Sequence, residues 1–230
     1  MIYSVEENIL EKHKSLEGWV MNRFLLLIFS FFVFSSNPCF AGKKATFRKV
    51  LAEFESNRFK QFKKAINSNK ALLNETDSEG IGFVNLAVTR NRLDWVKFLH
   101  EAGADLKRPA QDGFYFTPLH TAAVRGYLEI AKFLVSQGVP YNIPIEAGVN
   151  QGYTPLCYAA IRGHLNVFRY LVGLGASPFE KITNGHFKDM TPLYVGVARN
   201  PKDFGPYSKK LLKQNTTIAA ALDSSGGGGA

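Results

Sequence analysis

Apolar residues in the stretch 117–138 follow the spacing of two short helices that share one buried face. The stretch reads TPLHTAAVRGYLEIAKFLVSQG. Thr117 can cap a helix N-terminus, and Pro118 takes the first helical position, where its missing N–H is not needed. After Gly126, apolar side chains recur at three- and four-residue spacing over 128–135. Because a helix pair this small cannot bury that face alone, the pattern predicts neighbouring units of the same kind.

Three further stretches carry the same pattern. Residues 154–175 read TPLCYAAIRGHLNVFRYLVGLG, and residues 191–200 read TPLYVGVARN. A weaker copy, GFVNLAVTRNRLDWVKFLHEAG, occupies residues 82–103. The copies start at positions 82, 117, 154 and 191, so successive starts are 35, 37 and 37 residues apart. A fixed period of this length is typical of a stacked repeat architecture.

The two strong copies resemble ankyrin repeats, whose period is about 33 residues. The resemblance covers roughly residues 77–213 and is weaker in the first and last copies. It implies an all-α fold, an ankyrin-repeat solenoid of stacked helix-turn-helix units with β-turn fingers. We expect about four repeats, and their approximate bounds are 77–109, 110–147, 148–183 and 184–215. The resemblance also implies that the chain binds another protein, but it names no partner.

Residues 42–76 are expected to form a basic N-terminal helical cap. Between residues 43 and 70 there are nine basic and two acidic side chains. Apolar residues at mixed three- and four-residue spacings predict helices over about 44–56 and 58–68. The charge is explained by solvation, because a terminal repeat needs a polar outer face. The functional alternative is a patch for an acidic protein or anionic lipid headgroups, with nucleic acid ranked last because no nucleic-acid-binding motif appears.

The N-terminus has the parts of a secretory signal peptide. A short basic start at Arg23 precedes an apolar run of eleven residues at 24–34 and a small-x-small exit at 39–41. Eleven residues are short for a membrane span, which needs about 20. We therefore expect residues 1–41 to be a signal peptide that is cleaved after Ala41. A signal peptide together with ankyrin-like repeats resembles exported bacterial proteins, so we expect this protein to be periplasmic or secreted.

Three alternatives to this interpretation stay open. Residues 24–34 could remain uncleaved and anchor the protein in a membrane, or they could form a buried core helix. Translation could also start at Met21, because residues 1–20 have an acidic balance that is unlike the start of a signal peptide.

The sequence predicts no catalytic residue, no cofactor and no metal site. Of the two cysteines, Cys39 lies in the predicted signal peptide, so Cys157 has no disulfide or metal-site companion. Cys157 replaces the His of the TPLH motif, which favours a packing role over a reactive thiol. At the same position in its own copy, His120 is expected to form a local turn hydrogen bond, as the resemblance implies. No phosphate-binding loop or nucleophile elbow appears.

Four arginines occupy equivalent positions in the copies, each followed by Asn or Gly. This pattern is typical of a helix end, where a cation meets the carbonyl end of the dipole and the next residue tolerates a left-handed conformation. The alternative is that Arg125 and Arg162 also bind an acidic partner. The four are Arg90, Arg125, Arg162 and Arg199.

The connections between copies carry extra length and aromatic residues. In ankyrin-type stacks these connections project as fingers on one edge, and insertions there often form the binding face. Exposed aromatics on a rigid edge are typical of protein interfaces. The alternative is that some of them pack beneath the fingers. The candidates for partner contact are Phe114, Tyr115, Phe116, Tyr141, Tyr153, Phe179 and Phe187.

The C-terminal part departs from the repeat pattern. The segment 201–206, PKDFGP, interrupts the place where a second helix is expected, so we predict a helix only over about 207–214. We expect a disordered tail at 216–230, in which residues 216–222 could add a frayed turn. The leading hypothesis is an exported, monomeric, non-enzymatic module that binds a partner protein through its finger loops and concave helix face. The alternative is a membrane-peripheral adaptor that holds anionic lipid headgroups with its basic cap.

Overall fold

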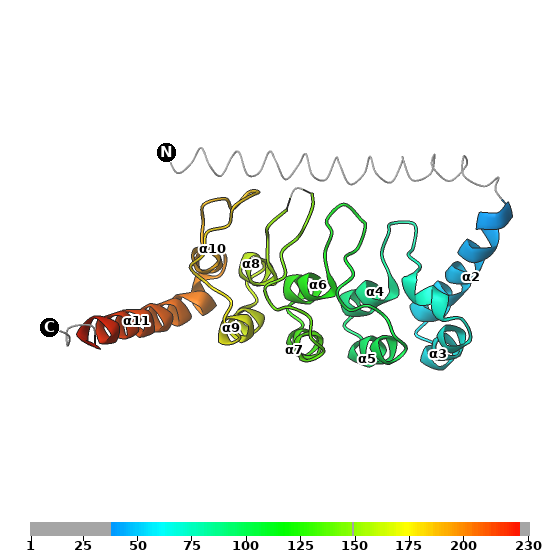
Figure 1. Cartoon of the computed structure of the whole chain (residues 1–230), viewed down its shortest axis with the longest axis horizontal. Coiled ribbons are helices and arrows are strands. Elements are labelled where there is room, and N and C mark those ends of the chain that lie inside the picture. Colours follow the sequence, from blue (N-terminus) through cyan, green and yellow to red (C-terminus); the bar gives the residue numbers. More distant parts are fainter. Residues whose placement is uncertain (1–37, 149, 226–230) are drawn as a thin grey trace. The chain divides into compact units, whose positions relative to one another are not determined.

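The computed structural model of the chain describes residues 38–148 and 150–225 (Figure 1). The chain divides into two units, residues 1–52 and 53–230. Helix α2, Pro38–Glu55, is the described part of the first unit and continues into the second. The apolar run at 24–34 and most of the predicted signal peptide lie outside the described residues. None of the helices in the described ranges is both long and apolar enough to cross a membrane.

The second unit is built from pairs of antiparallel helices. In Figure 1 the inner helices form one row, the outer helices form a second row, and long connections project on the side of the inner row. This arrangement confirms the predicted all-α repeat solenoid. Before the pairs come α3 (Phe59–Ser68) and the 3-10 helix η1 (Lys70–Asn74). The inner helices are α4 (Phe83–Thr89), α6 (Pro118–Arg125), α8 (Pro155–Ile161) and α10 (Pro192–Arg199). The outer helices are α5 (Leu93–Glu101), α7 (Leu128–Ser136), α9 (Leu165–Gly173) and α11 (Pro201–Ser225).

The inner helices begin and end as the sequence predicts. The Thr117 hydroxyl accepts a hydrogen bond from the backbone N–H of His120, and Pro118 takes the first helical position. At the other end of α6, Gly126 has φ 75°, in the left-handed region that favours glycine. A β-carbon there would also lie 2.6 Å from the His164 ring, so two constraints select glycine at this turn.

Small residues allow the inner helices to pack closely. Ala122 and Ala123 of α6, and Ala159 and Ala160 of α8, are completely buried. The outer helices fill the rest of the core with larger side chains. The largest fully buried ones include Leu134, Phe168 and Phe204.

At the N-terminal end of the second unit, aromatic rings fill the core. The Phe54 ring lies 4.8 Å from the Trp95 ring and 5.7 Å from the Phe62 ring, both edge to face. The Arg92 guanidinium lies 4.8 Å from the centres of both the Phe54 and Trp95 rings. Arg92 Nη1 also donates a hydrogen bond of 2.7 Å to the Phe54 carbonyl oxygen. The cation therefore ties α5 to the residues that precede α3.

The predicted interruption at 201–206 is wrong, because α11 begins directly at Pro201. Proline is tolerated at the first helical position, since the N–H that it lacks has no partner there. Asn200 caps the helix: its Oδ1 accepts from the N–H of Asp203, and its Nδ2 donates to Asp203 Oδ2 at 2.8 Å. Four residues along, Phe204 is fully buried against Gly196 of α10.

Two helix bounds also differ from expectation. Helix α11 continues to Ser225, although we expected at most a frayed turn in a disordered tail from residue 216 onward. The segment 216–223, TTIAAALD, contains four strong helix formers, and their propensity carries the helix on. Residues 226–230 lie outside the described residues. At the other end, α2 begins at Pro38 rather than near 44, whereas α3 agrees closely with the predicted helix at 58–68.

Candidate functional site

The three connections that follow α5, α7 and α9 form fingers with closed bases. In the first finger, the N–H of Ala110 donates to the Phe116 carbonyl oxygen at 2.9 Å. In the second finger, the N–H of Ile145 donates to the Tyr153 carbonyl oxygen at 2.9 Å. In the third finger, the N–H of Ile182 donates to the Met190 carbonyl oxygen, also at 2.9 Å. Each base thus holds two chain segments together, so that the residues between them project from the inner-helix side (Figure 1).

The tip of the first finger presents two exposed aromatic side chains. Phe114 is 47% exposed and Tyr115 is 36% exposed. The Asp112 carboxylate accepts hydrogen bonds from the N–H groups of Phe114, at 2.9 Å, and Tyr115, at 3.3 Å. Tyr115 has φ 55°, a conformation that the surrounding turn imposes on a non-glycine residue. Two aromatic rings on a turn held in this way offer a partner a large contact area at low entropic cost.

The remaining finger aromatics turn partly or wholly inward. Tyr153 is only 2% exposed, and its hydroxyl accepts a hydrogen bond of 3.1 Å from the N–H of Phe187. Tyr153 therefore joins the second and third fingers, and it packs beneath the fingers instead of facing a partner. Phe116 is half-buried, with its ring 4.8 Å from that of Tyr158. The other half-buried candidates are Tyr141, Phe179 and Phe187.

Tyr158 is a residue of this cluster that the sequence analysis missed. It lies on α8 between Phe116 and Tyr153, its ring centre is 5.6 Å from that of Tyr153, and it is 7% exposed. Its hydroxyl is buried and has no hydrogen-bond partner among the described residues. Burial raises the pKa of the Tyr158 phenol. The sequence held one indication of this role, because Tyr158 replaces the smaller Thr121 of the preceding copy.

His120 joins its own helix to the next finger. It is fully buried, with Nδ1 2.8 Å from the Thr117 hydroxyl and Nε2 3.1 Å from the Tyr153 carbonyl oxygen. Because a carbonyl only accepts, the network assigns the proton to Nε2, and the Thr117 hydroxyl donates to Nδ1. Burial lowers the pKa of His120 to about 4, although the Tyr153 bond opposes this. The predicted local hydrogen bond is confirmed, and His120 stays neutral near pH 7.

Cys157 takes the same place in the next copy. It is buried, and its Sγ lies 3.3 Å from the Thr154 hydroxyl oxygen. Burial raises the pKa of the Cys157 thiol, so the reactive thiolate is disfavoured. Its environment is that of a packing residue.

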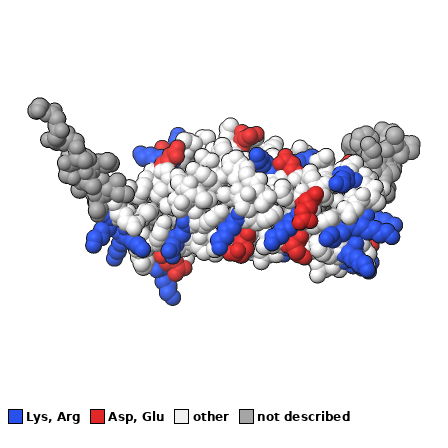
Figure 2. Space-filling view, turned by 60° about the horizontal axis from the view of Figure 1, so that its bottom comes forward, with Lys and Arg blue, Asp and Glu red and all other residues white. Residues whose placement is uncertain are grey.

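Basic and acidic residues are unevenly distributed along the repeats. Residues 71–146 contain seven basic and nine acidic side chains, whereas residues 147–215 contain nine and three. Figure 2 shows Lys and Arg side chains beside α11, at the left, and a mixture of both signs over the middle of the stack. Within residues 71–215 the C-terminal repeats are therefore the more basic part, and residues 43–70, at the other end of the repeats, are basic as well.

The four equivalent arginines lie at the ends of the inner helices. The residue after the arginine is left-handed in three copies: Asn91 has φ 55°, Gly126 75° and Gly163 74°. The helix-end interpretation is therefore confirmed in those copies. Arg90 Nη2 forms an ion pair of 2.7 Å with Glu55.

The other three arginines differ in their surroundings. Arg125 and Arg162 are exposed and form no ion pair among the described residues. The Arg199 guanidinium lies 5.4 Å from the centre of the Phe187 ring. Two cations of the series are thus available to acidic groups of a partner.

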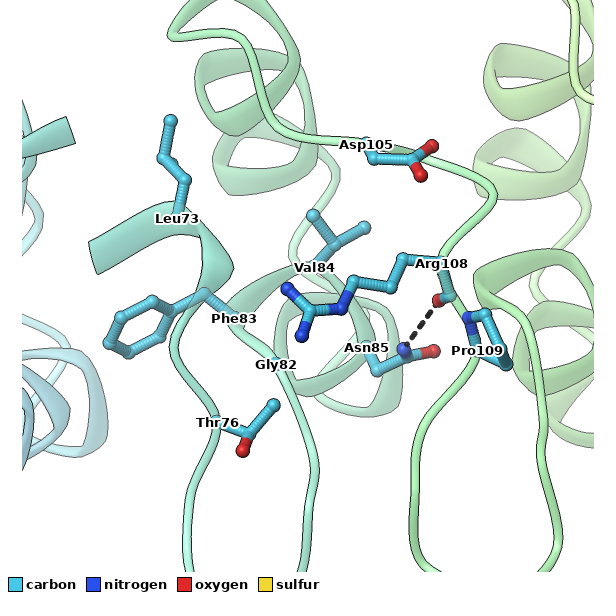
Figure 3. Close-up of a pocket in the computed structure, with 9 residues that line it drawn as sticks. All are labelled: Leu73, Thr76, Gly82, Phe83, Val84, Asn85, Asp105, Arg108 and Pro109. Carbon is cyan, nitrogen blue, oxygen red and sulfur yellow. Dashed lines mark hydrogen bonds between the residues drawn. The ribbon is translucent and has the colours of Figure 1, made fainter. Parts of the chain in front are cut away.

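A small pocket lies where α4 begins (Figure 3). Asn85, which corresponds to His120 in the repeat, donates from Nδ2 to the Arg108 carbonyl oxygen at 3.2 Å. Its Oδ1 is buried and has no hydrogen-bond partner in the described part of the chain, because Gly82 stands where the later copies have a threonine hydroxyl. The Arg108 side chain crosses the pocket and donates to the Asn74 carbonyl oxygen at 2.7 Å. The cavity measures about 20 Å³, which is room for one water-sized group.

Among the residues that the structure describes, no three His, Cys, Asp or Glu side chains lie close enough together to hold a metal ion. The finger tips and the exposed arginines of the inner helices, by contrast, are suited to contact with another macromolecule.

Comparison with known proteins agrees with the repeat architecture. The family model for ankyrin repeats, three copies, matches residues 52–145 and residues 84–182. The match includes α3, which we assigned to the N-terminal cap. Protein phosphatase 1 regulatory subunit 27 from Mus musculus is 36% identical over 73 residues, which is 32% of this chain and 46% of that protein. The Homo sapiens protein of the same name matches to the same extent. The chain spans a little under half the length of these relatives.

Proposed function

Because this chain belongs to the ankyrin repeat family, we propose that it is a non-enzymatic module that binds a partner protein through its finger tips and inner-helix face. The observation that carries the proposal is the exposed pair Phe114 and Tyr115, held by Asp112 above a closed finger base. A rigid turn with two aromatic rings loses little conformational entropy when a partner covers it.

The partner is proposed to carry acidic groups opposite Arg125 and Arg162. These two side chains extend from the ends of α6 and α8 and have no ion-pair partner in the described part of the chain. The relatives are named regulatory subunits, which supports a role in which this chain acts by holding another protein.

Photo-crosslinking tests which side of the stack meets the partner. A photoreactive phenylalanine analogue is placed at Tyr115 or, as control, at Leu174 after outer helix α9; the two residues are 36% and 37% exposed. We expect a crosslinked adduct from position 115 and none from position 174. The double variant Phe114→Ser, Tyr115→Ser should abolish binding but leave thermal unfolding unchanged. Adducts of equal yield from both positions would contradict the finger proposal.

We also propose that the protein acts after export, with residues 1–41 removed. The basic start, the apolar run and the small-residue exit support this proposal. Intact-mass measurement of the untagged protein after cell fractionation tests it. A mass that begins at Gly42 in the periplasmic or secreted fraction is expected. A full-length cytoplasmic species would refute export, and an uncleaved membrane species would instead indicate an anchor at 24–34.

A second candidate function is peripheral attachment to an anionic membrane through α3. Lys60 and Lys64 of α3 are exposed and form no ion pair among the described residues, whereas Arg58 is paired with Glu53 at 3.4 Å. Vesicles that contain anionic lipid should retain the mature protein at low salt and release it at high salt. Lys60→Gln with Lys64→Gln should weaken retention, and Lys181→Gln with Lys188→Gln is the control of equal charge. Absence of retention at low salt excludes this candidate.

A further inference from the structure

One position of the repeat is buried in three copies and exposed in the fourth. It is the residue three places after the cap of each inner helix. Asn85 is 5% exposed, His120 is 0% and Cys157 is 5%, but Tyr194 is 61% exposed. The buried three lie beneath the following copy; His120, for example, contacts the carbonyl oxygen of Tyr153. No described residue covers Tyr194 in the same way, so a large aromatic side chain stands at a stacking position.

The helix after Tyr194 does not turn back as its equivalents do. The outer helices α5, α7 and α9 each have nine residues and then lead to the next finger. Helix α11 has 25 residues and extends away from the stack, beyond α10 (Figure 1). Its first turns are held by the Phe204 and Tyr207 rings, which lie 5.0 and 6.1 Å from that of Phe168. The free side of α10 and the extension of α11 therefore form the end of the described stack.

This end surface combines apolar and basic side chains. Met190 is 39% exposed and Leu212 is 50% exposed. Exposed lysines at seven- and four-residue spacing, Lys202, Lys209 and Lys213, lie on one face of α11, and Lys210 is exposed beside them. From residue 190 to residue 215 there are five basic side chains and one acidic side chain, Asp203. Asp203 already accepts a hydrogen bond of 2.8 Å from Asn200.

The charge decides what can cover this surface. A terminal repeat normally presents a polar outer face, so exposed Tyr194, Met190 and Leu212 require another explanation. A second copy of the chain that stacks end to end would bring the same lysines together, and like charges at an interface cost several kcal/mol. Head-to-tail stacking would place the basic α3 of a second copy, with Lys60 and Lys64, against these lysines, and this is an equally poor match of charge. An acidic partner gains from the same charges.

We propose that the end surface, made of Met190, Tyr194 and Leu212 with the lysines of α11, docks an acidic amphipathic helix of a partner protein. The apolar face of that helix covers Tyr194 where a further repeat would stack, and its carboxylates meet Lys202, Lys209 and Lys213. The surface is separate from the finger tips, so the two can be tested independently.

Fluorescence anisotropy with a labelled synthetic peptide tests the proposal. The peptide is helical, with Leu on one face and Glu on the other, and a second peptide has every Glu replaced by Lys. We expect saturable binding of the Glu peptide and none of the Lys peptide. Tyr194→Ser should weaken binding about tenfold, the effect of losing one interface hot spot. Because Tyr194 is exposed, thermal unfolding should be unchanged in this variant.

Charge-matched variants locate the binding site. Lys209→Gln with Lys210→Gln should weaken peptide binding, whereas Lys60→Gln with Lys64→Gln removes the same charge from α3 and should not. Equal weakening by both pairs would show unspecific attraction and overturn the proposal. The finger variant Phe114→Ser, Tyr115→Ser should bind the peptide normally, which separates this result from the proposed finger function. A dimer in analytical ultracentrifugation that Tyr194→Ser dissociates would identify a second copy as the occupant and refute the acidic partner.

Discussion

His120 Nε2 lies 3.1 Å from the carbonyl oxygen of Tyr153, and this bond joins inner helix α6 to the base of the following finger. Tyr153 in turn accepts a hydrogen bond through its hydroxyl from the N–H of Phe187 in the third finger. A chain of buried polar contacts thus runs from one repeat through the next. These contacts hold the fingers in position relative to the inner helices.

Replacement of His120 by Ala should destabilise the stack by about 2–4 kcal/mol, because a buried side chain and two hydrogen bonds are lost. The midpoint of urea unfolding measures this loss. Tyr194→Ala is the matched control, since Tyr194 occupies the same position in the repeat but is 61% exposed. The control should change stability by less than about 1 kcal/mol. Similar losses in the two variants would show that His120 makes no special contribution.

Acid should destabilise the protein through His120. Burial holds its pKa at about 4 in the folded protein, below the ordinary 6.5, so the unfolded chain binds the proton more readily. The loss begins as the pH falls below about 6.5 and is complete below about 4. The two pKa values correspond to a difference of about 3 kcal/mol.

Urea unfolding of the wild type and of His120→Gln between pH 7 and pH 4 isolates this contribution. The variant retains the carboxylates that also titrate in this range, so only the His120 contribution is removed. Its stability should fall less steeply with acid than that of the wild type. Parallel curves would exclude His120 as a source of acid sensitivity.

A methyl group added at Gly196 should disturb the packing of α10 on α11. The new β-carbon would collide with the Phe204 ring, and Phe204 is fully buried. We expect Gly196→Ala to lower stability by about 1–3 kcal/mol, the usual cost of overpacking. Circular dichroism during thermal unfolding measures the change.

Gly205→Ala on α11 is the control for helix propensity. A β-carbon at Gly205 meets nothing within 4 Å. Alanine should therefore stabilise the helix by up to about 1 kcal/mol. The two substitutions are chemically identical, so opposite signs would attribute the Gly196 effect to contact with Phe204 alone.

Arg92 should contribute about 2–3 kcal/mol to the free energy of unfolding through its contacts at the N-terminal end of the second unit. Its guanidinium lies over the Phe54 and Trp95 rings and bonds the Phe54 carbonyl oxygen. Arg92→Met keeps the apolar contact but removes the charge and the hydrogen bond. Trp fluorescence should report an unfolding transition at lower urea concentration. Arg125→Met, at an exposed helix end, should leave the transition unchanged.

The error at 201–206 shows where local rules were insufficient. Proline and glycine were interpreted as an interruption, but Pro201 takes the first helical position, where its missing N–H has no partner, and Asn200 supplies the cap. The second proline of the segment, Pro206, lies inside the helix, and the helix continues past it. In the earlier copies an outer helix follows the inner helix at once, and this equivalence predicted the start of α11 better than the local residues did. Among the finger aromatics, Phe114 and Tyr153 were equal candidates in the sequence, yet one is exposed and the other is buried.

The sequence by itself determined the repeat, its period and the ends of the inner helices, because caps, prolines and glycines act through neighbouring backbone groups. Thr117, Pro118 and Gly126 needed no distant partner to be interpreted. The tertiary structure alone decided that the position of His120 is buried and that the equivalent position of Tyr194 is exposed. His120 and Tyr194 have the same local environment in the motif, and only the presence of a following copy separates a buried contact from an exposed ring. At this position, burial depends on what stacks on the helix, and the residues of the helix alone do not determine it.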